Sequence, residues 1–264
     1  MKKYLIREKN LFLTSLVFFT RIPVKMKNYR EEWLNSSTKY ISIIGWIVGG
    51  MGSLVFLAAH WLLPFSLAVA ISMIFTIWLT GAFHEDGFAD ICDGLGGGYS
   101  KEQILTIMKD SRTGAYGVVG MILMLLSKFL ALHAVAPGMI PVVLLSGHTL
   151  SRMMVPTLIH TADYVRDIDT SKIKPVGKKI QTGEFVFALL TGLAVLFLLP
   201  SRIFLLSLPV LLLVYFLSRR MLIKQISGYT GDALGALQQI SELVFYLAYL
   251  AIVKHYNDLI WLFT

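Results

Sequence analysis

The sequence has few charged residues and almost no cysteine. Only 15% of its 264 residues are Asp, Glu, Lys or Arg, and Cys92 is the single cysteine. Soluble domains carry about 25% charged residues, so the composition excludes an ordinary soluble domain, and a lone thiol excludes an intramolecular disulfide. Hydrophobic residues instead make up 56% of the chain. This composition predicts an all-α, polytopic integral membrane helical bundle.

The apolar segments predict about seven transmembrane helices within one membrane-embedded domain over residues 1–264. A spanning helix needs about 20 apolar residues. Leu11–Phe19 is too short to span, and no small-x-small cleavage site follows it. We therefore expect it to lie at the interface or to re-enter the membrane, as part of an N-terminal interfacial segment, 1–40. The predicted spans are 41–63, 64–83, 116–136, 139–160, 185–200, 203–218 and 235–253.

Lys and Arg are concentrated in alternate connections between these spans. They number nine in 1–40, three in 84–115, five in 161–184 and three in 219–234, against two in the other connections. Basic loops stay in the cytoplasm, so we expect a multi-pass protein of the cytoplasmic (inner) cell membrane with a cytoplasmic N-terminus. The net charge of +8 then reflects topology and contact with membrane lipid, and no nucleic-acid partner is expected. The polar loop 161–184 is a candidate lid.

Four carboxylates lie within nine residues directly after the second predicted span. They are Glu85, Asp86, Asp90 and Asp93. The last three are spaced i, i+4 and i+7 and share one arc of a helix, whereas Glu85 points elsewhere. Like charges on one face repel each other unless protons or a metal intervene, and carboxylate oxygens suit Mg²⁺ or Mn²⁺. The alternative is a solvated acidic helix start, which the helix dipole favours.

A second polar stretch follows glycines in 94–98, which are expected to form a flexible hinge. The segment 100–110 predicts a short amphipathic helix capped by Ser100. The residues at its end are Lys109, Asp110, Ser111 and Arg112. Two cations around a carboxylate suit a metal-bound phosphate, with Asp110 on the metal and the cations on phosphate oxygens. A basic loop that caps the next helix is the alternative.

A third polar stretch opens the last predicted span, with Asp232 near its start and Glu242 deeper. A carboxylate that deep faces protein or a cavity, so we expect Glu242 to have a functional or supporting role. The glycines of this stretch allow close helix packing, and packing alone is their alternative role. Lys128 and Arg152 also lie inside predicted spans, where Arg152 needs a carboxylate or water and Lys128 pairs or snorkels.

Several carboxylates beside Lys and Arg, with no nucleophilic triad, indicate metal-assisted phosphoryl transfer. That chemistry needs charge neutralisation and in-line positioning rather than covalent help. Two Mg²⁺ ions bridging a diphosphate would activate an attacking hydroxyl and stabilise the leaving phosphate. The membrane location indicates a large, amphipathic or membrane-associated substrate.

Four motifs carry a resemblance to a known family. They are Phe18–Val24, Gly81–Gly94, Ile107–Gly114, and Thr230–Ala236 with Ser241–Val244. Over nearly its full length the chain resembles cobalamin synthase, the adenosylcobinamide-GDP ribazoletransferase family. One departure is Glu85, where family members often carry an apolar residue, so a metal role for Glu85 rests on its carboxylate alone.

The resemblance implies a Mg²⁺-dependent enzyme that acts in the last steps of cobalamin biosynthesis. A free ribose hydroxyl of α-ribazole, or of its 5′-phosphate form, attacks the cobinamide-side phosphorus of adenosylcobinamide-GDP. GMP leaves, and adenosylcobalamin or its 5′-phosphate forms. With the active site on the cytoplasmic side, Asp232 or His84 is the candidate base that accepts the hydroxyl proton.

The site residues that we expect fall into three overlapping groups. The catalytic candidates are Asp86, Asp90, Asp93, Asp110, His84 and Asp232. The metal candidates are Asp86, Asp90, Asp93, Asp110 and Glu85. The substrate-binding candidates are Lys109, Arg112, Ser111, Arg21, Thr230, Gln239 and Glu242. Homo-oligomers and association with other cobalamin-assembly enzymes stay open.

Two other functions compete with this interpretation. The Asp-Gly-Phe-Ala segment at 86–89 is similar to part of the Asp-Gly-x-x-Ala motif of CDP-alcohol phosphotransferases, but the later spaced aspartates of that motif are absent. A divalent-cation transporter would need carboxylates near mid-membrane in more than one span. Here the acidic motifs map to the cytoplasmic boundary, and only Glu242 lies deep.

Overall fold

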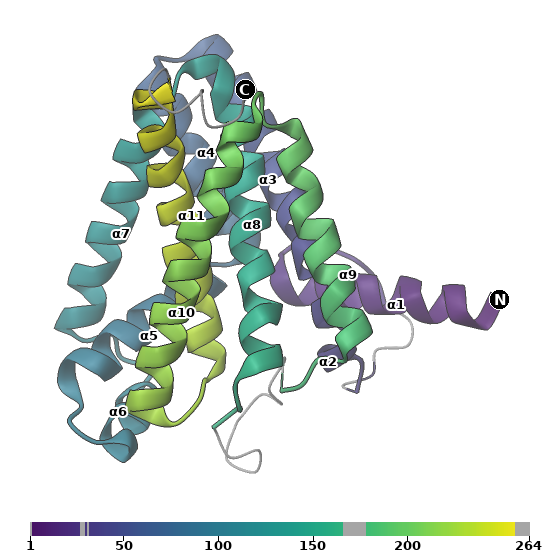
Figure 1. Ribbon diagram of the computed structural model, residues 1–264, viewed down its shortest axis with the longest axis vertical. Helices are drawn as coiled ribbons and strands as arrows, with labels where there is room; N and C mark the ends of the chain where they lie inside the picture. The colour runs from purple at the N-terminus through teal and green to yellow at the C-terminus, as the bar shows by residue number, and fades with distance from the viewer. Residues whose placement is uncertain (1, 27–29, 31, 166–177, 257–264) are drawn as a thin grey trace.

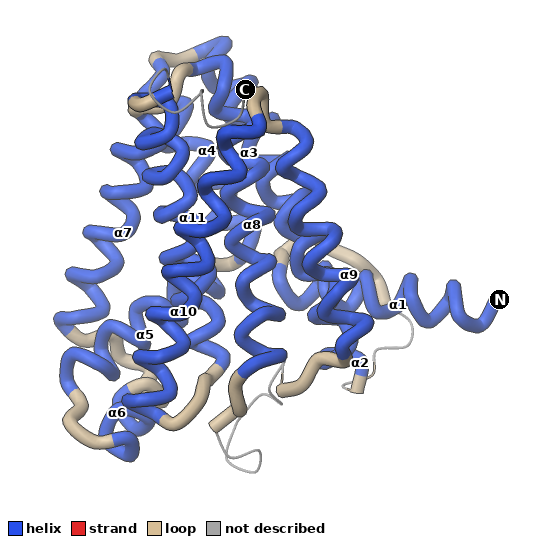
Figure 2. The backbone as a smooth tube through the Cα atoms, in the orientation of Figure 1, coloured by secondary structure: helices blue, strands red, loops and turns tan. Residues whose placement is uncertain are grey.

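Helices make up the regular secondary structure of the chain, as far as it is described. The structure, a computed structural model, describes residues 2–26, 30, 32–165 and 178–256, and these contain no strand (Figures 1 and 2). The helices are α1 (Lys2–Phe19), α2 (Trp33–Ser37), α3 (Ile41–Leu62), α4 (Phe65–Thr80), α5 (Phe83–Gly97), α6 (Lys101–Ile107), α7 (Ala115–His133), α8 (Ile140–Thr161), α9 (Thr182–Leu193), α10 (Ser207–Ile226) and α11 (Gly231–Lys254).

The predicted class, an all-α polytopic membrane bundle, is confirmed, although the structure has fewer long spans than expected. Five described stretches, built around α3, α7, α8, α10 and α11, are long and apolar enough to cross a membrane. A sixth is obtained if α4 and α5, bent by 88°, form one broken span. The predicted span 185–200 corresponds to α9, which has only 12 residues before it tightens into a 3₁₀ turn over Ala194–Leu198.

The apolar faces of the helices pack around α8, which is the central helix. In its most apolar stretch 83% of the residues are buried inside the protein, against 28% for both α7 and α10. α3 packs along α8, and α11 packs on both α8 and α5. The exposed surfaces of α7 and α10 are rich in Leu, Ile and Val, as expected for helices that face lipid.

The connections gather at two opposite ends of the bundle (Figure 2). One end carries α5, α6, the ends of α8 and α9 that flank residues 162–181, and the start of α11 (Figure 1). These are the connections that the charge distribution assigned to one side of the membrane. Most of the candidate lid 161–184 lies outside the described residues.

The N-terminal helix α1 lies across the bundle rather than along it (Figure 1). It extends over 18 residues, further than the predicted Leu11–Phe19, and its second half is buried against the bundle. The first half exposes Tyr4, Leu5 and Ile6 next to basic residues. α1 is not among the candidate spans, and its interfacial position stays a prediction.

Ser100 caps α6 as predicted, whereas the prediction of a flexible glycine hinge over 94–98 was wrong. The Ser100 hydroxyl accepts a hydrogen bond from the Gln103 amide at 3.3 Å. Gly94, Gly96 and Gly97 belong to the last turns of α5. Their bare surface lets side chains pack directly on the helix backbone, because a Cβ on Gly94 would lie 2.6 Å from Met108 and one on Gly96 2.5 Å from the Tyr116 ring.

Gly45 makes the closest approach between α3 and α8, and we predict that it tolerates no larger side chain. A Cβ at this position would lie 2.6 Å from the His148 carbonyl oxygen, which is backbone and cannot move aside. Gly45→Ala should lower the free energy of unfolding by about 1–3 kcal/mol through overpacking. The measurement is thermal unfolding in detergent.

Gly50→Ala, also on α3, is the matched control. Its Cβ would meet only the Leu145 side chain, at 4.0 Å, so its stability should equal or slightly exceed that of the native protein. Equal stability of the two variants would show that the α3–α8 contact is not as tight as described.

Candidate active site

The acidic helix α5 is set by a sharp break in the chain after α4. Gly81 and Ala82 both adopt left-handed backbone conformations, with φ of 68° and 56°, and α5 leaves at 88° to α4. The left-handed region costs a non-glycine residue about 1–2 kcal/mol, so surrounding contacts must hold Ala82 there. Arg21 lies over the break: its amide donates to the Leu79 carbonyl at 2.7 Å, and a Cβ on Gly81 would lie 2.7 Å from Arg21 Nε.

The predicted acidic arc exists on α5, but its three aspartates have different surroundings. Asp86 is exposed, Asp90 is half-buried and Asp93 is buried. Asp86 and Asp90, one turn apart, are therefore the two carboxylates of the arc that a ligand from solution reaches most easily.

Asp93 holds the start of α7. Its two carboxylate oxygens accept hydrogen bonds from the backbone amides of Gly114 at 2.7 Å and Gly117 at 2.8 Å. These amides belong to the first turn of α7, whose N–H groups have no partner within the helix. The predicted metal ligand thus performs, in this structure, the task of a helix cap contributed from a neighbouring helix.

The loop before α7 carries an exposed ion pair between two predicted ligands. Arg112 Nη2 lies 2.7 Å from Asp110 Oδ2, and the Arg112 amide also donates to Asp110. The guanidinium and the amide of Arg112 together lower the pKa of Asp110 to about 2. Asp110 is therefore ionised throughout the physiological range, as a metal ligand or a partner of a cation must be. Lys109 and Ser111 are exposed on the same loop.

The start of α11 packs directly against α5. Thr230 caps α11, its hydroxyl accepting from the Ala233 amide at 3.3 Å. A Cβ on Gly87 would lie 2.9 Å from Asp232 Cα, and one on Gly235 would lie 3.1 Å from the His84 carbonyl oxygen. Two predicted motifs almost 150 positions apart in the sequence therefore meet through backbone contacts at glycines.

His84 faces the interior. Its ring stacks on Phe19 with centroids 6.2 Å apart, it is 2% exposed, and neither ring nitrogen has a hydrogen-bond partner in the described part of the chain. The other predicted base, Asp232, is half-buried at the start of α11.

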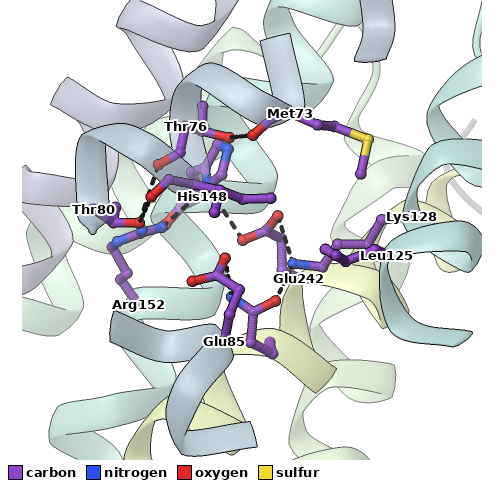
Figure 3. Close-up of a pocket in the computed structure, with 11 residues that line it drawn as sticks. Met73, Thr76, Thr80, Glu85, Leu125, Lys128, His148, Arg152 and Glu242 are labelled. Carbon is purple, nitrogen blue, oxygen red and sulfur yellow. Dashed lines mark hydrogen bonds and ion pairs between the residues drawn. The ribbon is translucent and has the colours of Figure 1, made fainter. Parts of the chain in front are cut away.

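Behind α5 lies a cluster of buried polar side chains, which we call the buried network. At its centre Glu242 lies 2.9 Å from Lys128 Nζ and 3.2 Å from His148 Nδ1 (Figure 3). The members are Glu85, Lys128, His148, Arg152, Gln238, Gln239 and Glu242. All of these side chains are buried.

The buried network surrounds a small polar cavity. Its volume is about 20 Å³, and Glu85, Arg152 and Lys128 line it together with Thr76 and Thr80 of α4 (Figure 3). A cavity of this size holds about one water molecule and not a nucleotide or a corrinoid.

The network changes the interpretation of three predicted residues. Gln239 and Glu242 were predicted to bind substrate, and Glu85 was predicted to bind metal. In the structure Gln239 bonds to Glu85, Lys128 bonds to both Gln239 and Glu242, and the three predicted residues are at most 9% exposed. Lys128, His148 and Arg152 did not enter the predicted site. The signal for them was present, because charged residues inside spans require buried partners.

Comparisons with known proteins agree with this arrangement of motifs. The family model described as cobalamin-5-phosphate synthase matches residues 11–250. Proteins named adenosylcobinamide-GDP ribazoletransferase are similar to the chain: one from Shewanella amazonensis is 43% identical over 92% of this chain and 96% of its own length, and one from Vibrio cholerae El Tor is 39% identical over 93% and 95%. No solved structure matches.

The chain belongs to the cobalamin-5-phosphate synthase family. Membership makes it a transferase of cobalamin biosynthesis, as the resemblance of its motifs predicted. Glu242, the one carboxylate that the sequence placed deep in a span, is paired with Lys128.

The family's cobalamin chemistry raises the question of whether the residues present suit a Mg²⁺ ion. Within the described residues no three His, Cys, Asp or Glu side chains lie close enough to form a metal site. Mg²⁺ usually takes only one or two carboxylates and completes its shell with substrate phosphates and water. Asp86 and Asp90 fit that pattern because both reach solvent from one face of α5.

Asp93 should contribute to stability even when no metal is present. Asp93→Ala removes both caps of α7, and we expect a loss of about 1–2 kcal/mol in the free energy of unfolding. Thermal unfolding in EDTA measures this loss. Asp86→Asn, on the exposed part of the same helix, is the control and should leave the unfolding temperature unchanged. If Asp93→Ala unfolds like the native protein in EDTA, the capping role is wrong.

Proposed function

We propose that this family member joins a GDP-activated corrinoid, adenosylcobinamide-GDP, to α-ribazole or its 5′-phosphate, with Mg²⁺ and at the cytoplasmic face of the cell membrane. The observation that carries the proposal is the convergence of three polar motifs on α5. Asp93 holds the loop that ends at Gly114, and Gly87 lies against Asp232. The proposed substrates are those in the name of the relatives, adenosylcobinamide-GDP ribazoletransferase.

In the proposed reaction a free ribose hydroxyl oxygen of the ribazole attacks the cobinamide-side phosphorus. A new P–O bond forms, the P–O bond to the GMP phosphate breaks, and the hydroxyl proton passes to a base. Asp232 is the better base of the two candidates, because it is half-buried beside Gly87 whereas His84 is enclosed behind Phe19. A base must reach the substrate proton directly or through one water.

Asp86 and Asp90 would hold Mg²⁺, Asp110 would join them only after its ion pair with Arg112 opens, and Lys109 and Arg112 would bind phosphate oxygens. When bound, the ion supplies neutralisation of the charge that develops on the leaving phosphate. The Asp110–Arg112 pair, at 2.7 Å, would open on substrate binding, so that the carboxylate gains a cation and the guanidinium gains an anion. Because both groups are exposed, this exchange involves little desolvation. Ser111 and Arg21, on either side of α5, complete the proposed substrate contacts.

The orientation of the protein follows from charge. The basic connections 84–115 and 219–234, and the ends of α8 and α9 that flank the basic connection 161–184, lie at the end of the bundle that carries α5 and α6 (Figure 1). Basic loops remain cytoplasmic, and the nucleotide-activated substrate is expected on that side. Cysteine-accessibility labelling of the two ends in intact cells tests the orientation.

The function is tested with purified protein in nanodiscs. We expect release of GMP from adenosylcobinamide-GDP and α-ribazole in the presence of Mg²⁺, none in EDTA, and no reaction with a cytidine-diphosphate lipid. Turnover of the lipid instead of the corrinoid would identify a CDP-alcohol phosphotransferase.

Asp86→Asn and Asp90→Asn should each abolish turnover while the protein stays folded and inserted. The neutral amide keeps the shape of the side chain and removes the charge that binds the ion. The measurement is the rate of GMP release at saturating Mg²⁺, with thermal unfolding as the folding control. Near-normal rates for either variant would exclude that residue as a metal ligand.

Arg112→Ala should raise KM for the GDP-activated substrate by about tenfold, the equivalent of one charged hydrogen bond. Steady-state kinetics with varied nucleotide substrate measure the change. Arg202, exposed at the start of the 3₁₀ turn that precedes α10, provides the control variant Arg202→Ala, which should keep the native KM. An unchanged KM in Arg112→Ala would leave Arg112 only its ion pair with Asp110.

A further inference from the structure

Gln239 connects the membrane interior to α5 through a carboxamide whose orientation is fully determined. Its oxygen accepts from Lys128 Nζ at 2.6 Å. Its nitrogen donates to Glu85 Oε1 at 3.0 Å and to Gln238 Oε1 at 2.9 Å. A lysine ammonium is a donor only, so Lys128 fixes which end of the amide is the oxygen, and the nitrogen must then point to Glu85.

The other end of the network is saturated. The Glu242 carboxylate accepts from Lys128 at 2.9 Å, Gln238 at 2.7 Å and Tyr246 at 3.2 Å, and it lies 3.2 Å from His148 Nδ1. A buried carboxylate with this many partners has little freedom to move. Lys128 and Gln238 are therefore fixed by their bonds to Glu242, and the Gln239 amide, which bonds to both, is fixed as well.

Glu85 is the only member of the network that belongs to α5. It lies in the first turn, three residues after the strained Ala82, and is 9% exposed. Its Oε2 has no hydrogen-bond partner in the described part of the chain, and neither has Arg152 Nε. Both side chains line the 20 Å³ cavity, so the Gln239 bond is the direct polar link that we find between this carboxylate and the rest of the bundle.

Several features of α5, which carries Glu85 in its first turn, favour its displacement from this position. Its aspartates repel one another, its break from α4 places Ala82 at a φ of 56°, and its close backbone approaches to α11 are at Gly87 and Gly235, which contribute no side chain. A buried carboxylate without a partner is strongly unfavourable. Loss of the Gln239 bond would therefore drive Glu85, and the first turn of α5 with it, toward solvent.

We propose that Lys128, Gln239 and Glu85 form a positioning relay, which sets α5 from inside the membrane so that Asp86 and Asp90 reach the substrate. Glu85 acts through its bond to Gln239 and not as a metal ligand. Only the final link, from the position of α5 to turnover, rests on the proposed function.

Three variants test the relay. Gln239→Leu keeps the volume and removes both amide bonds. Lys128→Met keeps the length and removes the donor that orients the amide. Glu85→Gln keeps an oxygen that can accept from Gln239, so it separates a positioning role from a metal-binding role. Ser53→Ala is the matched control, because it removes a buried bond from Ser53 to the Pro141 carbonyl at 2.8 Å, between α3 and the start of α8.

The first readout is the position of α5 itself. Cys92, the single cysteine, lies on α5 and is half-buried, with its sulfur packed toward Gly120 of α7. Its rate of alkylation by N-ethylmaleimide therefore reports how tightly α5 packs, without any turnover. We expect Gln239→Leu and Lys128→Met to raise this rate about tenfold, whereas Ser53→Ala and Glu85→Gln should leave it near the native value.

The second readout is kinetic. Gln239→Leu and Lys128→Met should each lower kcat by about 10- to 100-fold and raise the Mg²⁺ concentration for half-maximal activity, with KM for α-ribazole little changed. The double variant should be no worse than the more impaired single variant, because both changes break one relay. Glu85→Gln should retain most of the native kcat.

Two results would overturn the relay. One is native alkylation and native kcat in folded Gln239→Leu, and the other is a loss in Glu85→Gln as complete as in Asp86→Asn, which would make Glu85 a direct ligand. Glu85→Gln stays informative if Gln239→Leu fails to accumulate. Fast alkylation in Gln239→Leu together with no GMP release by the native protein would retain the relay's hold on α5 and reject the proposed function instead.

Discussion

The turn at Gly81 and Ala82 determines where the acidic helix lies. A charged side chain in the hydrocarbon region is expensive, and a straight continuation of α4 would have carried Asp86, Asp90 and Asp93 along the bundle. The 88° turn instead brings α5 across one end of the bundle, where α7 and the start of α11 meet it. The motifs that the family shares by sequence become neighbours because of this turn.

The two faces of α5 have different electrostatic surroundings. Outward, Asp86 and Asp90 are accessible and suited to a cation from solution. Inward, the Glu85 carboxylate is buried together with a second carboxylate, Glu242, and with two cations, Lys128 and Arg152. Helix α5 thus has an open acidic surface on its outer side and a neutralised one toward the core. The neighbouring residues Glu85 and Asp86 lie on these opposite sides.

Much of the fold was predictable because it depends on local patterns. Apolar length gave the long helices, and the i, i+4, i+7 spacing correctly placed three aspartates on one helix. What the sequence could not show was how that helix is rotated and where α7 begins, and these decide that Asp93 caps Gly114 and Gly117. In the same way, the charges of Lys128 and Arg152 inside predicted spans indicated that both need buried partners. Which residues these partners are, Gln239 and Glu242 among them, depends on how α7, α8 and α11 face one another.

The balance of charge inside the bundle has a consequence for an enzyme in an energised membrane. A transmembrane voltage does work on a displaced net charge, about 2.3 kcal/mol per elementary charge per 100 mV. The carboxylates of Glu85 and Glu242 cancel the cations of Lys128 and Arg152, so a rigid shift of this group along the field requires almost no electrical work. The core that supports the acidic helix therefore carries almost no net charge on which a membrane voltage could act.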